Sequence, residues 1–118
     1  MEGSPGGRVD PVASVDRDDR GVVVHLTGEL DLYNAHRVRE ALLACCEEQP
    51  ERLVVDLAEV EFVDSTALGV LVEARTRMPD RQAFVLAAPR AETQRALEVS
   101  GLDKHFVIRT SVEEALAS

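Results

Sequence analysis

Short apolar runs rich in β-branched residues alternate along this chain with segments whose apolar residues recur at the helical period. The runs predict five strands, at residues 12–15, 21–27, 52–57, 82–88 and 106–108. The periodic segments predict four helices, at residues 35–48, 65–78, 91–99 and from 111 onward. Such alternation gives right-handed crossovers and helices packed on a parallel sheet. We therefore expect an α/β fold of order ββαβαβαβα, with a mixed, mostly parallel sheet of four to five strands.

Turn-forming residues set the expected boundaries of these elements. A turn at residues 18–21 makes a hairpin of the first two strands, and Gly28 is expected to end the second strand. Asn34 is expected to cap the first helix and Pro50 to stop it, while Gly101 ends the third helix.

Length and charge bound the organisation and the partners of the chain. Its 118 residues suit one domain, with a flexible Gly-, Pro- and Ser-rich tail at residues 1–10 and a folded domain at 11–118. The net charge of -9 disfavours nucleic acid and anionic lipid as ligands. No apolar run is long enough for a membrane span or a signal core, so we expect a cytoplasmic protein whose partner is another protein.

The two cysteines, Cys45 and Cys46, are adjacent and cannot form a disulfide framework. Cys45 falls on the apolar face of the first helix and is expected to be a core thiol. Cys46 is expected to be a neighbour of little consequence. A reducing compartment is the simpler interpretation.

The segment VEFVDSTALGVL, at residues 60–71, joins a strand pattern directly to a helix pattern. It places Ser65 at or just inside a helix N-terminus, where free N–H groups and the helix dipole favour an added phosphate. The structural alternative is equally direct, since Asp, Ser and Thr are the usual helix caps and Asp64 alone can fill that role.

The helix that starts at Ser65 divides into two faces at about 100° per residue. One face is apolar and should pack on the sheet: Ala67, Val70, Leu71, Ala74 and Met78. The opposite face carries a small, uncharged stripe: Ser65, Gly69, Val72 and Thr76. Either a partner docks along this stripe, or Val72 tucks under a neighbouring helix and Gly69 is incidental.

VEFVDSTALGVL resembles the phosphoacceptor segment of the anti-sigma factor antagonists, bacterial proteins built on the STAS domain. The resemblance continues, in consistent order, through GELD at 28–31, VVDL at 54–57, SGLDKHF at 100–106 and SVEEAL at 111–116. It covers roughly residues 9–118. One position departs from the pattern, because the family often has Gly where this chain has Ala67, which leaves the turn less backbone freedom.

The resemblance implies that Ser65 is the phosphoacceptor, with Thr66 as a possible second. It implies two protein partners, an anti-sigma factor that is also a serine protein kinase, and a metal-dependent serine phosphatase. The partner-binding residues are then drawn from the loop, the acceptor segment and the stripe: Gly28, Glu29, Asp31, Asp64, Thr66, Gly69, Val72 and Thr76. Unphosphorylated protein would bind the anti-sigma factor and release a sigma factor.

A phosphate would add charge where five acidic residues are expected to gather: Glu29, Asp31, Glu59, Glu61 and Asp64. It would therefore switch binding off. The alternative function is a scaffold or sensor module of the same fold, in a stress-signalling assembly, whose hydroxyls are not phosphorylated.

Catalysis is not expected. Ser65 lacks the flanking glycines of a nucleophile elbow, and His25, His36 and His105 share no local motif with it. No metal-ligand spacing appears, so we expect no metal and no cofactor. The chain is expected to be a monomer or a weak dimer.

Overall fold

The computed structural model of this protein describes residues 9–117, so most of the tail predicted at residues 1–10 lies outside the described residues. The elements are β1 (Val12–Asp18), β2 (Gly21–Leu30), α1 (Ala35–Glu47), β3 (Leu53–Val63), α2 (Ser65–Arg77), β4 (Phe84–Ala87), α3 (Ala91–Ser100), β5 (Val107–Arg109) and α4 (Val112–Ala117). Short 3-10 turns at Arg81–Ala83 and Leu102–Lys104 precede β4 and β5. The predicted order of strands and helices is confirmed.

The five strands form one sheet in the order β1-β2-β3-β4-β5. The predicted hairpin is confirmed, because β1 pairs with β2 antiparallel. All other pairs are parallel. The centre of the sheet is covered on both faces, which is why β3 and β4 begin with continuous buried apolar runs and not with an alternating pattern.

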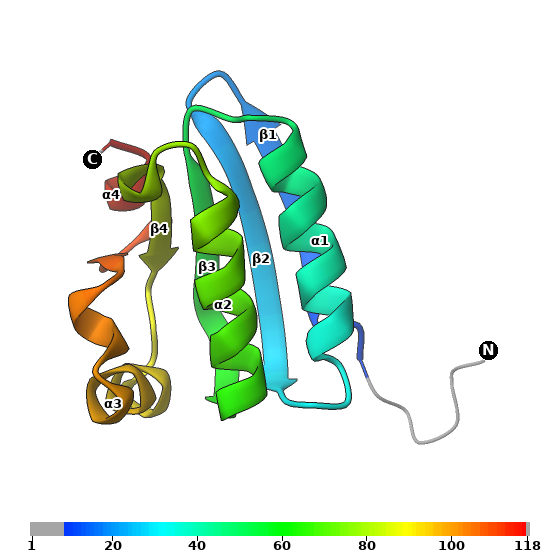
Figure 1. Ribbon diagram of the computed structural model, residues 1–118, viewed down its shortest axis with the longest axis vertical. Helices are drawn as coiled ribbons and strands as arrows, with labels where there is room; N and C mark the ends of the chain where they lie inside the picture. Colours follow the sequence, from blue (N-terminus) through cyan, green and yellow to red (C-terminus); the bar gives the residue numbers. More distant parts are fainter. Residues whose placement is uncertain (1–8, 118) are drawn as a thin grey trace.

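Two apolar clusters lie on opposite faces of the sheet. Alternate residues of the central strands, such as Val24 and Val55, face the larger cluster, to which α1, α2 and α3 contribute. The residues between them, such as Val23 and Val54, face a smaller cluster closed by α4. Figure 1 shows α1 and α2 side by side over one face of the sheet. The short α4 covers only part of the other face.

The prediction that Gly28 ends the second strand is wrong. β2 continues to Leu30, and Gly28 adopts a φ of +80° where the pairing with β3 shifts register. Glycine takes this left-handed conformation without a steric penalty, so it bends the strand through a bulge and does not stop it. β3 is longer than predicted for the same reason, since it follows β2 as far as Val63. Both strands therefore end at the same edge.

Two predictions about the first helix also need correction. Asn34 occupies the N-cap position of α1, but its side chain makes no capping bond. Cys46 is not a residue of little consequence, because it is buried and its Sγ donates to the Ala74 carbonyl of α2, 3.5 Å away. Cys45 is buried as predicted, and both thiols are free. Gly101 ends α3 with a φ of +79°, as expected of a C-cap glycine.

A histidine connects three strands on the face that α4 leaves open. Nδ1 of His25 in β2 lies 2.6 Å from Oδ2 of Asp56 in β3, and Nε2 lies 2.9 Å from Oδ2 of Asp16 in β1. Partial burial opposes protonation, but the hydrogen bonds and charges of Asp56 and Asp16 outweigh it and raise the pKa of His25 above its ordinary 6.5. Protonated His25 thus links β1 and β3 to β2 through hydrogen bonds and ion pairs.

The His25 contact makes stability depend on pH. Because the folded-state pKa is raised, the contribution is complete below the ordinary pKa of 6.5 and is lost as pH rises through the folded pKa. We expect His25→Gln to lower the free energy of unfolding by on the order of 1 kcal/mol at about pH 6, and by less at about pH 9. Urea denaturation at both pH values measures this. His36→Gln, at an exposed site of α1, is the control, and an equal loss at both pH values would contradict the prediction.

Candidate functional site

The carboxylate of Asp64 lies at the junction of β3 and α2 and binds two segments at once. Its Oδ1 accepts the Ala67 N–H at 2.9 Å, which caps α2. Its Oδ2 accepts the Leu32 N–H at 3.0 Å, from the loop between β2 and α1. The Asp64 N–H donates to the Leu30 carbonyl at 3.0 Å. One residue therefore fixes the start of α2 against the loop at residues 31–34, which we call the β2–α1 loop.

The β2–α1 loop is closed by its own polar side chains. Asn34 Oδ1 accepts the Asp31 N–H at 2.9 Å, and Asn34 Nδ2 donates to the Glu29 carbonyl at 2.8 Å. Asp31 Oδ1 accepts the Tyr33 N–H at 3.0 Å. These bonds use the Asn34 side chain that was expected to cap α1. Together with the Leu32 bond they fix the backbone of the loop before any partner binds.

Ser65 and Thr66 form the first two positions of α2, and both are exposed. The structural alternative was that the polar residues here are ordinary helix caps, with Asp64 alone able to fill that role. The cap is Asp64, so the Ser65 hydroxyl is not needed to hold α2 in place. The first turn of α2 carries no acidic residue, and its N-terminal dipole favours a negative group there.

Ala67, which departs from the pattern that the resemblance implies, fits the first turn of α2. Ala67 has a helical position in α2, donates its N–H to the Asp64 cap, and is buried at 2% exposure. Its methyl group therefore packs into the core, and this turn does not require a glycine.

The predicted division of α2 into two faces agrees with its burial. Ala67, Val70, Leu71, Ala74 and Met78 are all buried. On the opposite face, Ser65, Gly69 and Thr76 are exposed, whereas Val72 is half-buried and packs against the core. The Thr76 hydroxyl donates to the Glu73 carbonyl at 2.7 Å. Beside the stripe, Glu73 binds Arg39 of α1 through two contacts of 2.8 Å, which join the helices.

Gly69 has no packing reason to be a glycine within this chain. A Cβ at Gly69 would meet nothing within 4 Å, and the residue lies in the middle of an α-helix. Glycine in a helix interior costs about 1 kcal/mol relative to alanine. The open surface over Gly69 would allow another molecule to approach the backbone closely.

The five acidic residues expected around Ser65 are only partly brought together. Asp31 and Asp64 meet at the β2–α1 loop, and the pairing of Glu29 with Phe62 places Glu29 and Glu61 on neighbouring strands close by. Glu59 instead lies 3.9 Å from Arg90 at the start of α3. The charge near Ser65 is therefore carried by the β2–α1 loop and the end of β3.

Two apolar side chains of the β2–α1 loop were missed in the sequence. Leu32 is 60% exposed and Tyr33 is 70% exposed, beside the loop atoms that bind Asp64. The signal was present, because a leucine and the one tyrosine of the chain stand between a predicted strand and a predicted helix cap. Neither belongs to an amphipathic pattern that would bury it.

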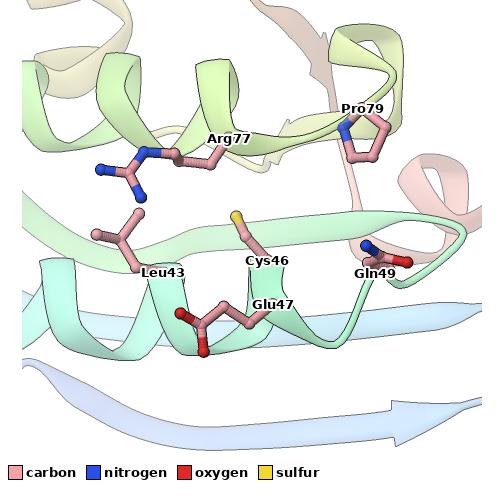
Figure 2. Close-up of a pocket in the computed structure, with 6 residues that line it drawn as sticks. All are labelled: Leu43, Cys46, Glu47, Gln49, Arg77 and Pro79. Atoms are coloured by element: carbon pink, nitrogen blue, oxygen red, sulfur yellow. The ribbon is translucent and has the colours of Figure 1, made fainter.

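A cavity near Cys46 lies apart from this site. It has a volume of about 200 Å³ and is lined by Leu43, Cys46, Glu47, Gln49, Arg77 and Pro79. Figure 2 shows the Cys46 sulfur pointing from α1 toward α2. Arg77 ends α2 and Ser65 begins it, about 18 Å away at 1.5 Å per residue. Burial raises the pKa of the Cys46 thiol, which disfavours the nucleophilic thiolate.

His25 is not positioned to act on Ser65. Both ring nitrogens of His25 bind carboxylates on the opposite face of the sheet. Residues 9–117 contain no cluster of three or more His, Cys, Asp or Glu side chains that could hold a metal ion. No helix in that part of the chain is long and apolar enough to cross a membrane.

Comparisons with known proteins show which family this chain resembles. The STAS domain signature matches residues 12–115. The anti-sigma-F factor antagonist RsfB of Mycobacterium tuberculosis is 32% identical over 108 residues, which cover 91% of this chain and 88% of RsfB. The anti-sigma-B factor antagonist of Listeria monocytogenes is 36% identical and covers 80% of this chain and 83% of its own length.

A solved structure agrees with the fold. The crystal structure of an anti-sigma factor antagonist from Mycobacterium paratuberculosis superposes with a TM-score of 0.82 at 31% identity, covering 88% of this chain and 89% of that one.

The two bonds of Asp64 can be separated by one substitution. Asn at position 64 keeps one carbonyl oxygen for the α2 cap, but its amide nitrogen cannot accept the Leu32 N–H. We expect Asp64→Asn to lower the free energy of unfolding by about 1 kcal/mol and Asp64→Ala by about 2 kcal/mol. Amide hydrogen exchange should quicken at Leu32 in both variants, but at Ala67 only in Asp64→Ala. Unchanged exchange at Leu32 in both would contradict the bridging role.

Gly69 and Gly28 form a matched pair for a second test. A Cβ meets nothing at either position, but only Gly28 has a positive φ, of +80°. We expect Gly69→Ala to raise the free energy of unfolding by about 0.5–1 kcal/mol, and Gly28→Ala to lower it by about 1 kcal/mol or more. Urea denaturation measures both. Destabilisation by Gly69→Ala would show that the chain itself requires this glycine.

Proposed function

The chain belongs to the STAS domain family of anti-sigma factor antagonists, and we propose that phosphorylation of Ser65 controls its binding to an anti-sigma factor that is also its serine kinase. In the unphosphorylated state it binds that partner and releases a sigma factor. A serine phosphatase restores this state. Two relatives, those of Mycobacterium and Listeria, are named as antagonists of anti-sigma-F and anti-sigma-B factors, which supports a partner of the same class.

The observation that carries the proposal is the spare hydroxyl of Ser65. Ser65 is exposed at the first position of α2, and Asp64 already supplies the helix cap. A kinase can therefore reach and modify the hydroxyl without removing a bond that the fold needs. Thr66, also exposed, is the second candidate acceptor.

The free energies involved favour a switch that changes the stability of the complex and not the stability of the fold. The N-terminus of α2 stabilises a nearby negative group by about 0.3–1 kcal/mol, and a phosphate adds about -1.5 to -2 charge. Two like unit charges at 4 Å near a protein surface repel by about 4 kcal/mol. Repulsion by a partner surface that had packed against a neutral hydroxyl is the larger effect. Phosphorylation would thus leave the protein folded and abolish binding.

The test compares Ser65→Ala and Ser65→Asp in binding to the purified cognate anti-sigma factor kinase. We expect Ser65→Ala to bind like the wild type and to accept no phosphate at position 65. We expect Ser65→Asp to bind at least about tenfold more weakly, because it places a negative charge in the interface. Isothermal titration calorimetry and site-resolved mass spectrometry measure the two effects.

Thr66→Ala is the matched control, because it removes the adjacent exposed hydroxyl of the same turn. It should retain both binding and phosphorylation. Equal binding by Ser65→Ala and Ser65→Asp would reject the switch. An absence of phosphate on Ser65 in protein from its own cells, across growth conditions, would favour a scaffold role.

A further inference from the structure

We propose that Leu32 and Tyr33 form an apolar anchor that holds the anti-sigma factor kinase in place independently of the charge on Ser65. This inference rests on the proposed function of Ser65 and divides the interface into two parts. The phosphorylation state of Ser65 determines whether the complex forms. The anchor supplies affinity and sets how well the kinase recognises its substrate.

The first support is the placement of apolar surface. Large exposed apolar side chains are few among the described residues: Val9, Leu32, Tyr33, Phe62 and Val99. Two of these are consecutive, and the backbone of one of them bonds directly to the residue before Ser65. Aromatic residues make up only 3% of the chain, and the one tyrosine is 70% exposed at this position. Tyrosine is enriched at the energetic centres of protein interfaces.

The second support is the rigidity of the backbone that presents these side chains. Side-chain oxygens of Asn34, Asp64 and Asp31 accept the N–H groups of Asp31, Leu32 and Tyr33 in turn. The next two N–H groups, of Asn34 and Ala35, donate to the Asp31 carbonyl at 3.2 and 2.8 Å. A loop ordered in this way loses little conformational freedom on binding, so exposed apolar groups on it contribute efficiently to affinity.

The charge around the anchor indicates the chemistry of its occupant. Leu32 and Tyr33 follow Glu29 and Asp31 in the chain and adjoin Asp64, within a protein of net charge -9. The complementary surface is an apolar pocket for Leu32 and Tyr33, with arginine or lysine side chains on the part of its rim that faces Glu29 and Asp31 and an uncharged or acidic surface opposite Ser65. Because the anchor lies against the start of α2, a protein that reaches Ser65 also covers it. Of the two proteins proposed to reach Ser65, the anti-sigma factor kinase is the one that stays bound to the unphosphorylated protein, so it is the occupant that we propose.

The anchor should separate recognition from phosphoryl transfer. Leu32 and Tyr33 belong to the substrate protein and are not among the groups of the kinase that transfer the phosphate, so their loss should weaken binding without slowing the chemical step. We expect the double variant Leu32→Ala with Tyr33→Ala to raise the KM for phosphorylation of Ser65 by about ten- to hundredfold, with kcat within about twofold. Its Kd for the same kinase should rise by a similar factor.

The experiment uses full-length protein, the purified cognate kinase and four forms: wild type, the double variant, Tyr33→Phe and Val99→Ala. Tyr33→Phe keeps the ring and should keep the wild-type KM. Val99→Ala removes another exposed apolar side chain, 81% exposed on α3, and should change nothing. Because all three sites are exposed, thermal unfolding of every variant should match the wild type.

Each outcome bears on the proposal. A raised KM in the double variant alone supports the anchor. A double variant that behaves like Val99→Ala, while the wild type binds and is phosphorylated, overturns the anchor and leaves the Ser65 switch intact. A wild type that neither binds the kinase nor accepts phosphate overturns the proposed function and the anchor with it.

Discussion

The carboxylate of Asp64 is the interaction on which the functional end of this molecule depends. Its two oxygens bind the backbone N–H groups of Ala67 in α2 and of Leu32 in the β2–α1 loop, although Asp64 and Leu32 are 32 residues apart in the chain. A carboxylate can accept both bonds because each oxygen has free lone pairs, whereas a serine or threonine cap offers a single oxygen. The start of α2 and the loop beside it therefore form one rigid unit. The Ser65 side chain is not a partner in these bonds, so its modification would leave them intact.

This arrangement requires two parallel strands that end together. β2 and β3 end at the same edge of the sheet, where the β2–α1 loop and α2 begin. Figure 1 shows both connections at the lower end of the molecule. Gly28 makes this possible, because the bulge at its positive φ lets β2 continue to Leu30 and remain paired with β3. Carboxyl ends of parallel strands are the usual position for binding sites in α/β proteins, since the loops there converge. Here they bring the β2–α1 loop against the start of α2.

The sequence predicted the architecture well because burial at the sheet centre leaves clear patterns. The β-branched runs around Val24 and Val55 and the apolar period of α2 were each long enough to assign. The errors concern residues with two possible uses. Gly28 can end a strand or bend it, and Asn34 can cap a helix or close the loop before it. The pairing of β2 with β3 decides the role of Gly28, and the path of the β2–α1 loop decides that of Asn34; the residue pattern alone contains neither.

The sequence predicts the parts of the site that depend on residue type. It does not predict the part that depends on exposure of a side chain to solvent. Asp64 and Ser65 stand out because acid and hydroxyl residues interrupt two apolar patterns. Leu32 and Tyr33 lie between two predicted elements and follow no apolar period, so the sequence marks their position, but only the structure shows that both side chains are exposed. Cys46 illustrates the reverse case, since its neighbour Cys45 fits the helical period and the second thiol is buried only because α2 packs over it.

A binding switch of this kind works best when affinity and control reside in different residues. A complex with a Kd near 1 μM has about -8 kcal/mol of binding free energy, and a repulsion of about 4 kcal/mol reduces it to about 1 mM. One phosphate therefore suffices, provided that the attractive part is moderate and is not itself destroyed by the charge. Apolar contacts meet that condition, because their free energy does not depend on the charge of a neighbouring group. In the proposed switch, the rigid loop beside Ser65 would supply such contacts at a fixed position, and the kinase that adds the phosphate would also be the partner that the phosphate repels.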